Sequence, residues 1–265
     1  VISLVNPKIG TELKTVKREG VDIVFAIDVS KSMLAEDIAP NRIIKSKRIV
    51  SELLNNLGSD RVGIIAYAST AIPVLPITTD FSSARMFLES LNTDMLSSQG
   101  TSIAEAINLS KNYFNDENQT NRVLCVISDG EDHEIQNNNL SDIAKEAGIT
   151  IISIGVGSPN GAPIPIKEND IVKSYKKDDK GEVVITKLNE NILKDMATQT
   201  GGIYFKGDNT NSVVSSIVDE LKEMDKQEFE SKQFVSFKDQ FQWFLFVGLF
   251  LIILDVVVFE RKTYW

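Results

Sequence analysis

The sequence has little cysteine, little histidine and no concentrated positive charge, and each shortage excludes a class of function. The single cysteine, Cys125, lies inside an apolar run and has no internal disulfide partner, so we interpret it as a packing residue. The single histidine, His133, excludes a His-rich metal site and most histidine-based catalysis. With a formal net charge of −9 and no Lys/Arg cluster, the chain is not expected to bind nucleic acid.

The start of the chain lacks both an initiator methionine and the pattern of a signal peptide. It opens with Val1, and no basic-then-apolar stretch follows. We therefore expect a processed or truncated piece, in which residues 1–20 form a juxtamembrane segment. Repeats and low-complexity tracts are also missing. The 265 residues, 42% of them hydrophobic and 25% charged, suffice for one large domain or two small ones.

One long hydrophobic run lies near the C-terminus, at residues 241–259. A helix of this length measures about 28 Å, close to the thickness of a bilayer core. Its acid, Asp255, lies near the end of the run, where the cost of insertion is lower. We predict a transmembrane helix over 241–259, a charged helical stalk over 226–240 and a tail over 260–265. A buried core helix is the alternative.

Strand-like apolar runs alternate with helix-like segments between residues 21 and 206. Such alternation predicts an α/β domain with a mostly parallel central sheet and helices on both faces. We place this domain at 21–225. The predicted strands are 21–28, 61–69, 71–79, 122–129, 149–157 and 202–207, with Pro73 and Pro76 making 71–79 an edge strand. The predicted helices are 41–58, 80–92, 101–114, 141–148 and 189–202.

Residues 158–189 interrupt the alternation. They hold three of the seven prolines and a turn-like "DDKGE" before the alternating "VVIT". This composition predicts a loop and a hairpin inserted at the edge of the domain. The insertion either shapes binding specificity, as loops on a rigid scaffold often do, or only decorates the edge.

Oxygen-bearing side chains gather at the predicted strand ends. In "DVSKS", Asp28, Ser30 and Ser32 stand at alternate positions where the first buried strand ends, while Asp129 ends another strand and Thr101 lies in "SQGTS". Ligands of such sheets bind at the carboxyl ends of the strands, and hard divalent cations take oxygen ligands. These five side chains therefore predict a Mg²⁺ site. Taken alone, each piece also fits an ordinary turn or helix cap.

Two carboxylates and three hydroxyls leave a divalent cation short of negative charge. Such a site should attract an anionic sixth ligand, an Asp or Glu carboxylate of another protein. Water activation is not expected, because the only spare acids nearby are Glu131 and Asp132 and no base is placed beside them. The pattern predicts a binding module and not an enzyme.

The same residues carry a family resemblance. The chain from about 20 to 206 resembles a von Willebrand factor type A (VWA) domain, whose metal-ion-dependent adhesion site (MIDAS) has the pattern DxSxS, a distant Thr and a distant Asp. The matching residues are Asp28, Ser30, Ser32, Thr101 and Asp129. The resemblance implies a Rossmann-like sheet and Mg²⁺ in the site, with Ca²⁺ or Mn²⁺ as substitutes.

Further stretches, among them "SDRVGIIAYA", "LPITTDFSSA" and "TGGIYF", resemble the membrane-anchored bacterial Bat family of aerotolerance operons, its BatB-like members in particular. The resemblance implies transmembrane helices on both sides of the domain, one of them before Val1. It also implies a periplasmic domain at the bacterial inner membrane, with other membrane proteins of one complex as partners. The basic "ERK" after the predicted span agrees with a cytoplasmic tail.

Two alternative functions are kept open. A metal-dependent phosphohydrolase with Asp28 as its nucleophile would need a second acid at position 30, where this chain has Ser30. A metal-independent scaffold would assemble through the stalk and span, using a stripe of phenylalanines on one side of a helix. That stripe would consist of Phe229, Phe234, Phe237 and Phe241.

Overall fold

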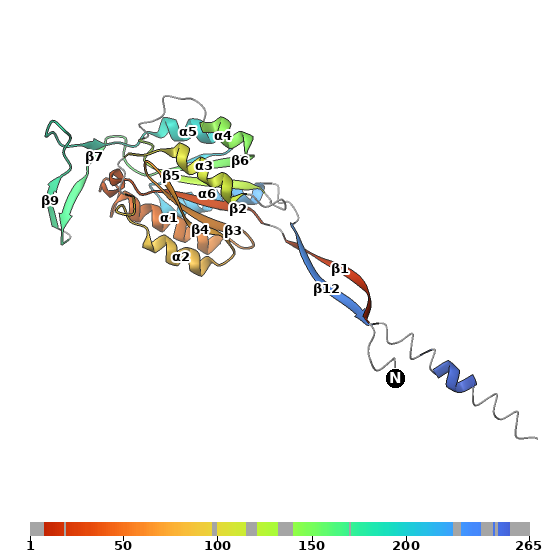
Figure 1. The fold of residues 1–265 in the computed structure, drawn as a ribbon. Helices are drawn as coiled ribbons and strands as arrows, with labels where there is room; N and C mark the ends of the chain where they lie inside the picture. The colour runs from red at the N-terminus through yellow and green to blue at the C-terminus, as the bar shows by residue number, and fades with distance from the viewer. Residues whose placement is uncertain are drawn as a thin grey trace, which may run out of the picture. The chain divides into compact units, whose positions relative to one another are not determined.

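The computed structural model of the chain describes residues 8–18, 20–96, 100–114, 121–131, 140–169, 171–224, 229–239, 246 and 249–254 (Figure 1). The chain divides into two compact units. The larger unit is Arg18–Phe229, and the smaller combines Val1–Lys17 with Glu230–Trp265.

The larger unit is built around a six-stranded sheet with the strand order β11-β6-β5-β2-β3-β4. The strands from β11 to β3 run parallel, and β4 pairs antiparallel with β3. Strands β2, β3, β5 and β6 are almost wholly buried, as expected for apolar runs covered on both faces. The predicted mostly parallel sheet is therefore confirmed. The strands are β2 (Asp22–Asp28), β3 (Arg61–Tyr67), β4 (Ala71–Thr78), β5 (Arg122–Ser128), β6 (Ile149–Gly155) and β11 (Tyr204–Lys206).

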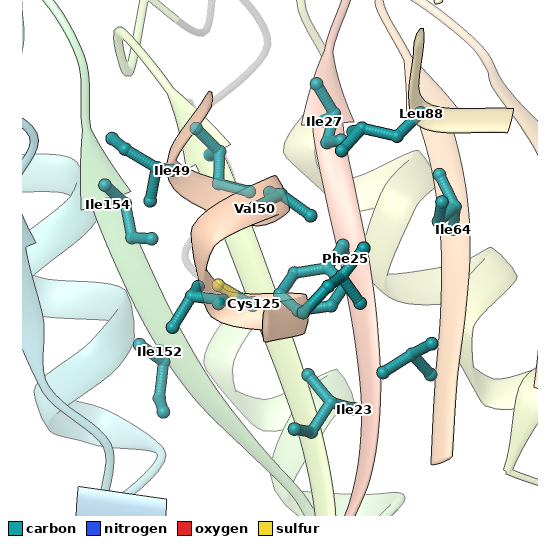
Figure 2. Close-up of a cluster of buried hydrophobic side chains, with 14 of the residues drawn as sticks. Ile23, Phe25, Ile27, Ile49, Val50, Ile64, Leu88, Cys125, Ile152 and Ile154 are labelled. Carbon is teal, nitrogen blue, oxygen red and sulfur yellow. The ribbon is translucent and has the colours of Figure 1, made fainter. Parts of the chain in front are cut away.

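Helices cover both faces of this sheet (Figure 1). On one face, α1, α2 and α6 pack against Ile23, Phe25 and Ile27, and Figure 2 shows part of this layer. On the other face, α3, α4 and α5 pack in one cluster with Val24 and Ala26. The side chains of β2 thus alternate between two buried layers, which fixes its register. The helices are α1 (Arg42–Asn56), α2 (Phe81–Ser90), α3 (Ile103–Tyr113), α4 (Leu140–Glu146), α5 (Glu190–Gln199) and α6 (Thr210–Glu223).

Each helix and strand predicted between 21 and 206 is present, with its ends shifted by a few residues. The edge position of the proline-containing strand is also confirmed, because β4 ends the sheet. Cys125 lies in the core layer of Figure 2, where burial raises the pKa of its thiol to about 12. Its interpretation as a packing residue therefore agrees with the structure.

The insertion, which we call the arm (residues 158–189), contains two small antiparallel ladders. In the first, β7 pairs with β10, and in the second, β8 pairs with β9. At the predicted turn "DDKGE" the chain does double back, with an antiparallel bridge between Lys177 and Val183, whereas the longer hairpin of β8 and β9 lies earlier in the arm than predicted. The strands are β7 (Ala162–Pro163), β8 (Pro165–Glu168), β9 (Ile171–Tyr175) and β10 (Ile185–Thr186).

The prediction of a helical stalk over 226–240 is wrong for its described part. Residues Phe229–Asp239 form a strand, β12, which pairs with β1 (Lys8–Arg18) in a two-stranded sheet of the smaller unit. The segment is rich in phenylalanine and also holds a valine, which favours strands once a pairing partner exists. The phenylalanines of this segment therefore do not share one side of a helix.

The predicted span lies mostly outside the described residues. Within it, residues 249–254 are helical. In the part of the chain that the structure describes, no helix is both long enough and apolar enough to cross a bilayer. The predicted tail 260–265, together with Asp132 and His133, also lies outside the described residues.

Candidate metal centre

The ends of β2, β3 and β5 meet at one edge of the sheet, which we call the carboxyl edge. The three strands are parallel neighbours, with Asp28 in register with Tyr67 of β3. Asp28 is the last residue of β2, and Asp129 directly follows β5. Both aspartates are 0% exposed. The structure therefore brings the two predicted acidic ligands to adjacent strand ends.

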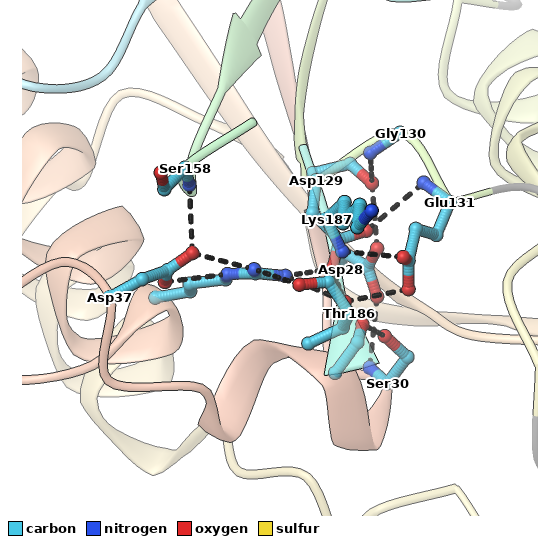
Figure 3. Close-up of polar contacts among 12 residues, drawn as sticks. Asp28, Ser30, Asp37, Asp129, Gly130, Glu131, Ser158, Thr186 and Lys187 are labelled. Carbon is cyan, nitrogen blue, oxygen red and sulfur yellow. Dashed lines mark hydrogen bonds and ion pairs between the residues drawn. The ribbon is translucent and has the colours of Figure 1, made fainter. Parts of the chain in front are cut away.

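The Asp28 carboxylate is fixed by hydrogen bonds at both of its oxygens (Figure 3). Oδ1 accepts from the Ser30 amide at 2.9 Å, and Oδ2 accepts from the hydroxyl of Ser128 at 2.7 Å. Burial and the negative charge of Asp129 raise the pKa of Asp28 to about 7, although these hydrogen bonds oppose the shift. Its buried surroundings therefore disfavour the ionised form of Asp28.

The two serines of the DxSxS motif lie together. Ser30 directly precedes a short 3-10 turn, η2 (Lys31–Leu34), and the Oγ atoms of Ser30 and Ser32 are 2.8 Å apart. Ser30 is buried and Ser32 is half-buried. The turn at the end of β2 thus directs two neutral hydroxyls to one place beside Asp28.

Thr101 reaches the same edge from a separate loop. It is 5% exposed, and the amide of the next residue, Ser102, donates to the Ala68 carbonyl at 2.8 Å, just past the end of β3. The hydroxyl oxygens of Ser69 and Ser102 are buried beside it and have no hydrogen-bond partner among the described residues. Buried polar atoms are usually paired, so these hydroxyls mark a place that lacks a polar neighbour.

Asp129 is held by a guanidinium that sequence reasoning did not find. Its Oδ2 lies 2.7 Å from Nη1 of Arg42, while its Oδ1 accepts from the Glu131 amide at 3.1 Å. Gly130, with φ of +69°, lets the chain turn here, because a Cβ at this position would lie 2.5 Å from the Asn189 carbonyl oxygen. The role of Arg42 could not be predicted from the sequence, because a charged residue at the start of an amphipathic helix is usually exposed to solvent.

Asp37 is a second partner of Arg42 that the sequence did not reveal. Its two carboxylate oxygens accept from Nε at 2.9 Å and Nη2 at 2.7 Å of the guanidinium. Burial alone would raise the pKa of Asp37, but the hydrogen bonds from Arg42 and the Ser158 amide hold it below its ordinary value. Asp37 therefore stays ionised. Its lowered pKa contrasts with the raised pKa of Asp28.

The residues present fit a hard divalent cation. The predicted donors are oxygens only, and among the described residues no group of three or more His, Cys, Asp or Glu side chains is placed to bind an ion. Asp37 and Asp129 share one guanidinium at this edge and Asp28 lies buried beside Asp129, so a divalent cation would supply further positive charge.

Comparison with known proteins identifies the family to which this fold belongs. A family model of the von Willebrand factor type A domain matches residues 23–131. The crystal structure of the conserved hypothetical protein BatB from Bacteroides thetaiotaomicron is 43% identical, with a TM-score of 0.72 over 77% of this chain and 98% of that one. The chain belongs to the Bat family of VWA proteins. An aerotolerance-related membrane protein from Bacteroides fragilis is 40% identical, with a TM-score of 0.73 over 77% of this chain and 100% of that one.

Other relatives of this Bat-family chain are more distant. A protein from Borreliella burgdorferi is 26% identical over 264 residues, which cover 98% of this chain and 75% of that protein. The match to the UPF0353 protein of Mycolicibacterium vanbaalenii, at 25% identity, spans about half of that relative, 51% of its length. Proximal thread matrix protein 1 from the mussel byssus shares the fold, with a TM-score of 0.58 and 14% identity.

Proposed function

We propose that the chain is a non-enzymatic binding module that recognises a protein partner through a divalent cation at the carboxyl edge. The observation that carries the proposal is the pair of buried carboxylates, Asp28 and Asp129, at adjacent strand ends beside hydroxyls on the same edge. A bound Mg²⁺ would offer an Asp or Glu carboxylate of the partner a positive centre. The proposed ligand residues are Asp28, Ser30, Ser32, Thr101 and Asp129.

The surroundings of the carboxyl edge support binding over hydrolysis. Glu131 is the described acid nearest in sequence to Asp129, and both of its oxygens are occupied. Oε1 accepts from the Lys187 amide and Oε2 from the Thr186 hydroxyl, each at 2.6 Å. A carboxylate held in this way is badly placed to take a proton from water.

The choice of cation follows from the donor chemistry. Carboxylate and hydroxyl oxygens suit Mg²⁺, and Ca²⁺ or Mn²⁺ are acceptable substitutes. The mussel protein that shares the fold has been solved with a zinc-occupied MIDAS motif, so the fold itself tolerates a divalent cation. We expect Mg²⁺ to be the resident ion of this chain.

We place the module at the periplasmic face of the bacterial inner membrane, anchored by residues 241–259. The apolar run and the basic residues after it support this location, as does the Bacteroides fragilis relative, which is described as a membrane protein. We expect its partners to be other membrane proteins of one aerotolerance-related complex.

The proposal is tested by calorimetric titration of Mg²⁺ and Mn²⁺ into the full chain in detergent. We expect binding at one site in the wild type and its loss in Asp28→Ala, with the thermal unfolding transition retained. Asp219→Ala is the matched control, because it removes the same charge from an exposed position on α6. Absence of binding to the folded wild type would overturn the metal-dependent function and favour the scaffold.

A further inference from the structure

Arg42 is a fully buried arginine at the first position of α1. Its guanidinium grips Asp37 with two parallel hydrogen bonds, as described above. Burial alone would lower the pKa of Arg42, but Asp37 and the charge of Asp129 together raise it, so the group stays ionised. A bidentate pair of this kind fixes the plane of the guanidinium as well as its position.

The rest of the guanidinium joins two other parts of the fold. Nη1 donates to Oδ2 of Asp129 at 2.7 Å and to Oγ1 of Thr186 at 2.8 Å, while Nη2 donates to the Thr186 carbonyl at 3.1 Å. Together with the two bonds to Asp37, each of the five N–H groups of an arginine has an acceptor. Thr186 is the last residue of β10, so Arg42 directly connects β5 with the arm.

Both ends of the arm are bound to this network. At its start, the Ser158 amide donates to Oδ2 of Asp37 at 2.7 Å. At its end, Glu131 accepts from Thr186 and Lys187, and the Leu188 amide donates to the Ser158 carbonyl at 3.1 Å. We call Ser158 with residues 186–188 the neck of the arm. The neck is therefore tied to the carboxyl edge through Asp37, Arg42 and Glu131 (Figure 3).

The backbone also leaves room for this arginine. Gly157, just before the neck, has a φ of +140°, and a Cβ there would lie 2.9 Å from Nε of Arg42. The chain passes so close to the guanidinium that a side chain at this position would collide with it. This close approach indicates that Arg42 and the neck pack as one unit.

We propose that Arg42 is a positioning residue that aims the Asp129 carboxylate at the candidate metal centre and clamps the neck of the arm to it. The role of Arg42 in clamping the neck does not depend on a metal. Its role in positioning Asp129 rests on the proposed function. A lysine at this position would keep the charge but offers three donors from a single point, so it cannot reproduce the planar set of five.

The test uses Arg42→Lys in the full chain in detergent, with Arg61→Lys as the matched control. Arg61 also forms a bidentate pair, with Asp22, but at the other end of the sheet. In metal-free protein, we expect amide hydrogen exchange at Ser158, Lys187 and Leu188 to accelerate about tenfold or more in Arg42→Lys only. We also expect its Mn²⁺ dissociation constant to rise about 10- to 100-fold, the usual range for groups that orient a ligand.

Unchanged neck exchange in folded Arg42→Lys would overturn the clamp. Faster exchange with unchanged Mn²⁺ affinity would overturn the positioning of Asp129. If the wild type binds no Mn²⁺, the proposed function and the Asp129 part fail together, while neck exchange still decides the clamp. If Arg42→Lys does not fold, Thr186→Val removes one acceptor of the same guanidinium, and the same changes are expected with smaller factors.

Discussion

The two ends of the central sheet use the same residue types in different proportions. At the amino edge, where β2 and β3 begin, the Arg61 guanidinium meets one carboxylate, with Nε and Nη2 lying 2.7 and 2.6 Å from the oxygens of Asp22. At the carboxyl edge, Asp37 and Asp129 share the guanidinium of Arg42, and Asp28 lies buried close to Asp129. The pair of Arg61 and Asp22 is balanced in charge, whereas the group of Asp28, Asp37, Asp129 and Arg42 has three carboxylates for one guanidinium.

This difference separates a structural ion pair from a candidate binding site. A balanced pair needs nothing further, whereas surplus buried charge costs stability and persists where a ligand can offset it. The pKa of Asp28 is raised to about 7, first by burial and second by the negative charge of Asp129. We therefore expect substitutions at the carboxyl edge to affect stability and cation binding together, and those at the amino edge to affect stability alone.

The largest contrast is expected from removing each guanidinium. Arg42→Met leaves Asp37 and Asp129 without the cation that they share and should lower the free energy of unfolding by about 4 kcal/mol. Arg61→Met should cost about 2 kcal/mol, because Arg61 is 22% exposed and water can reach its partner once it is removed. Urea unfolding followed by circular dichroism measures both. Equal losses would contradict the proposed difference between the edges.

A smaller contrast is expected from two glycines with similar backbone angles. Gly130 at the carboxyl edge has φ +69° and Gly148 at the amino edge has φ +63°. Gly148→Ala should cost about 1 kcal/mol, since nothing lies within 4 Å of the new Cβ. Gly130→Ala should cost about 2–3 kcal/mol, because its Cβ collides with the Asn189 carbonyl. Thermal unfolding gives the order, and Mn²⁺ affinity should fall only in Gly130→Ala.

The smallest effect is a gain of stability. Because the folded-state pKa of Asp28, about 7, lies above its ordinary value of 3.8, the folded chain binds this proton more tightly than the unfolded chain. Its contribution to stability is therefore complete below about pH 4 and is lost as the pH rises through 7. At pH 8 without divalent cations, Asp28→Asn should be more stable than the wild type by about 1–2 kcal/mol.

Measurements at two pH values check this prediction for Asp28→Asn. Denaturant unfolding at pH 5 and pH 8 should show the advantage of Asp28→Asn shrinking at the lower pH, where the wild-type carboxyl is already protonated. A variant that is less stable than the wild type at pH 8 would show that Asp28 supports the fold there and that its charge is already compensated. Mg²⁺ should stabilise the wild type and not this variant.

Much of the fold follows from local patterns. The buried strands are continuous apolar runs, and the helices between them carry their own amphipathic spacing, so a window of ten residues contains enough information. The proximity of the DxSxS side chains could also be predicted, because Asp28, Ser30 and Ser32 are neighbours in one turn. Asp129 needed only the rule that parallel strands end at the same edge, whereas Thr101, in a loop before α3, was predicted through the family resemblance.

The features that escaped prediction depend on contacts between distant segments. The strand β12 exists because it pairs with β1 from the other end of the chain, and no local pattern contains that partner. Arg42 meets Asp129 and Thr186 across 87 and 144 residues of sequence. The Arg42 side chain carries a charge, yet it is fully buried. Only its partners in the folded chain explain this burial.

The neck has a consequence for how the domain can vary. Because the Leu188 amide meets the Ser158 carbonyl at 3.1 Å, the polypeptide leaves and rejoins the body at almost the same point. The part of the arm beyond the neck, residues 159–185, can therefore diverge in length and sequence without shifting the register of any strand in the central sheet. An arm exchanged between homologues would have to keep the neck contacts with Asp37, Arg42 and Glu131. It would also have to match the body at Glu36, which pairs with Lys167 of the arm.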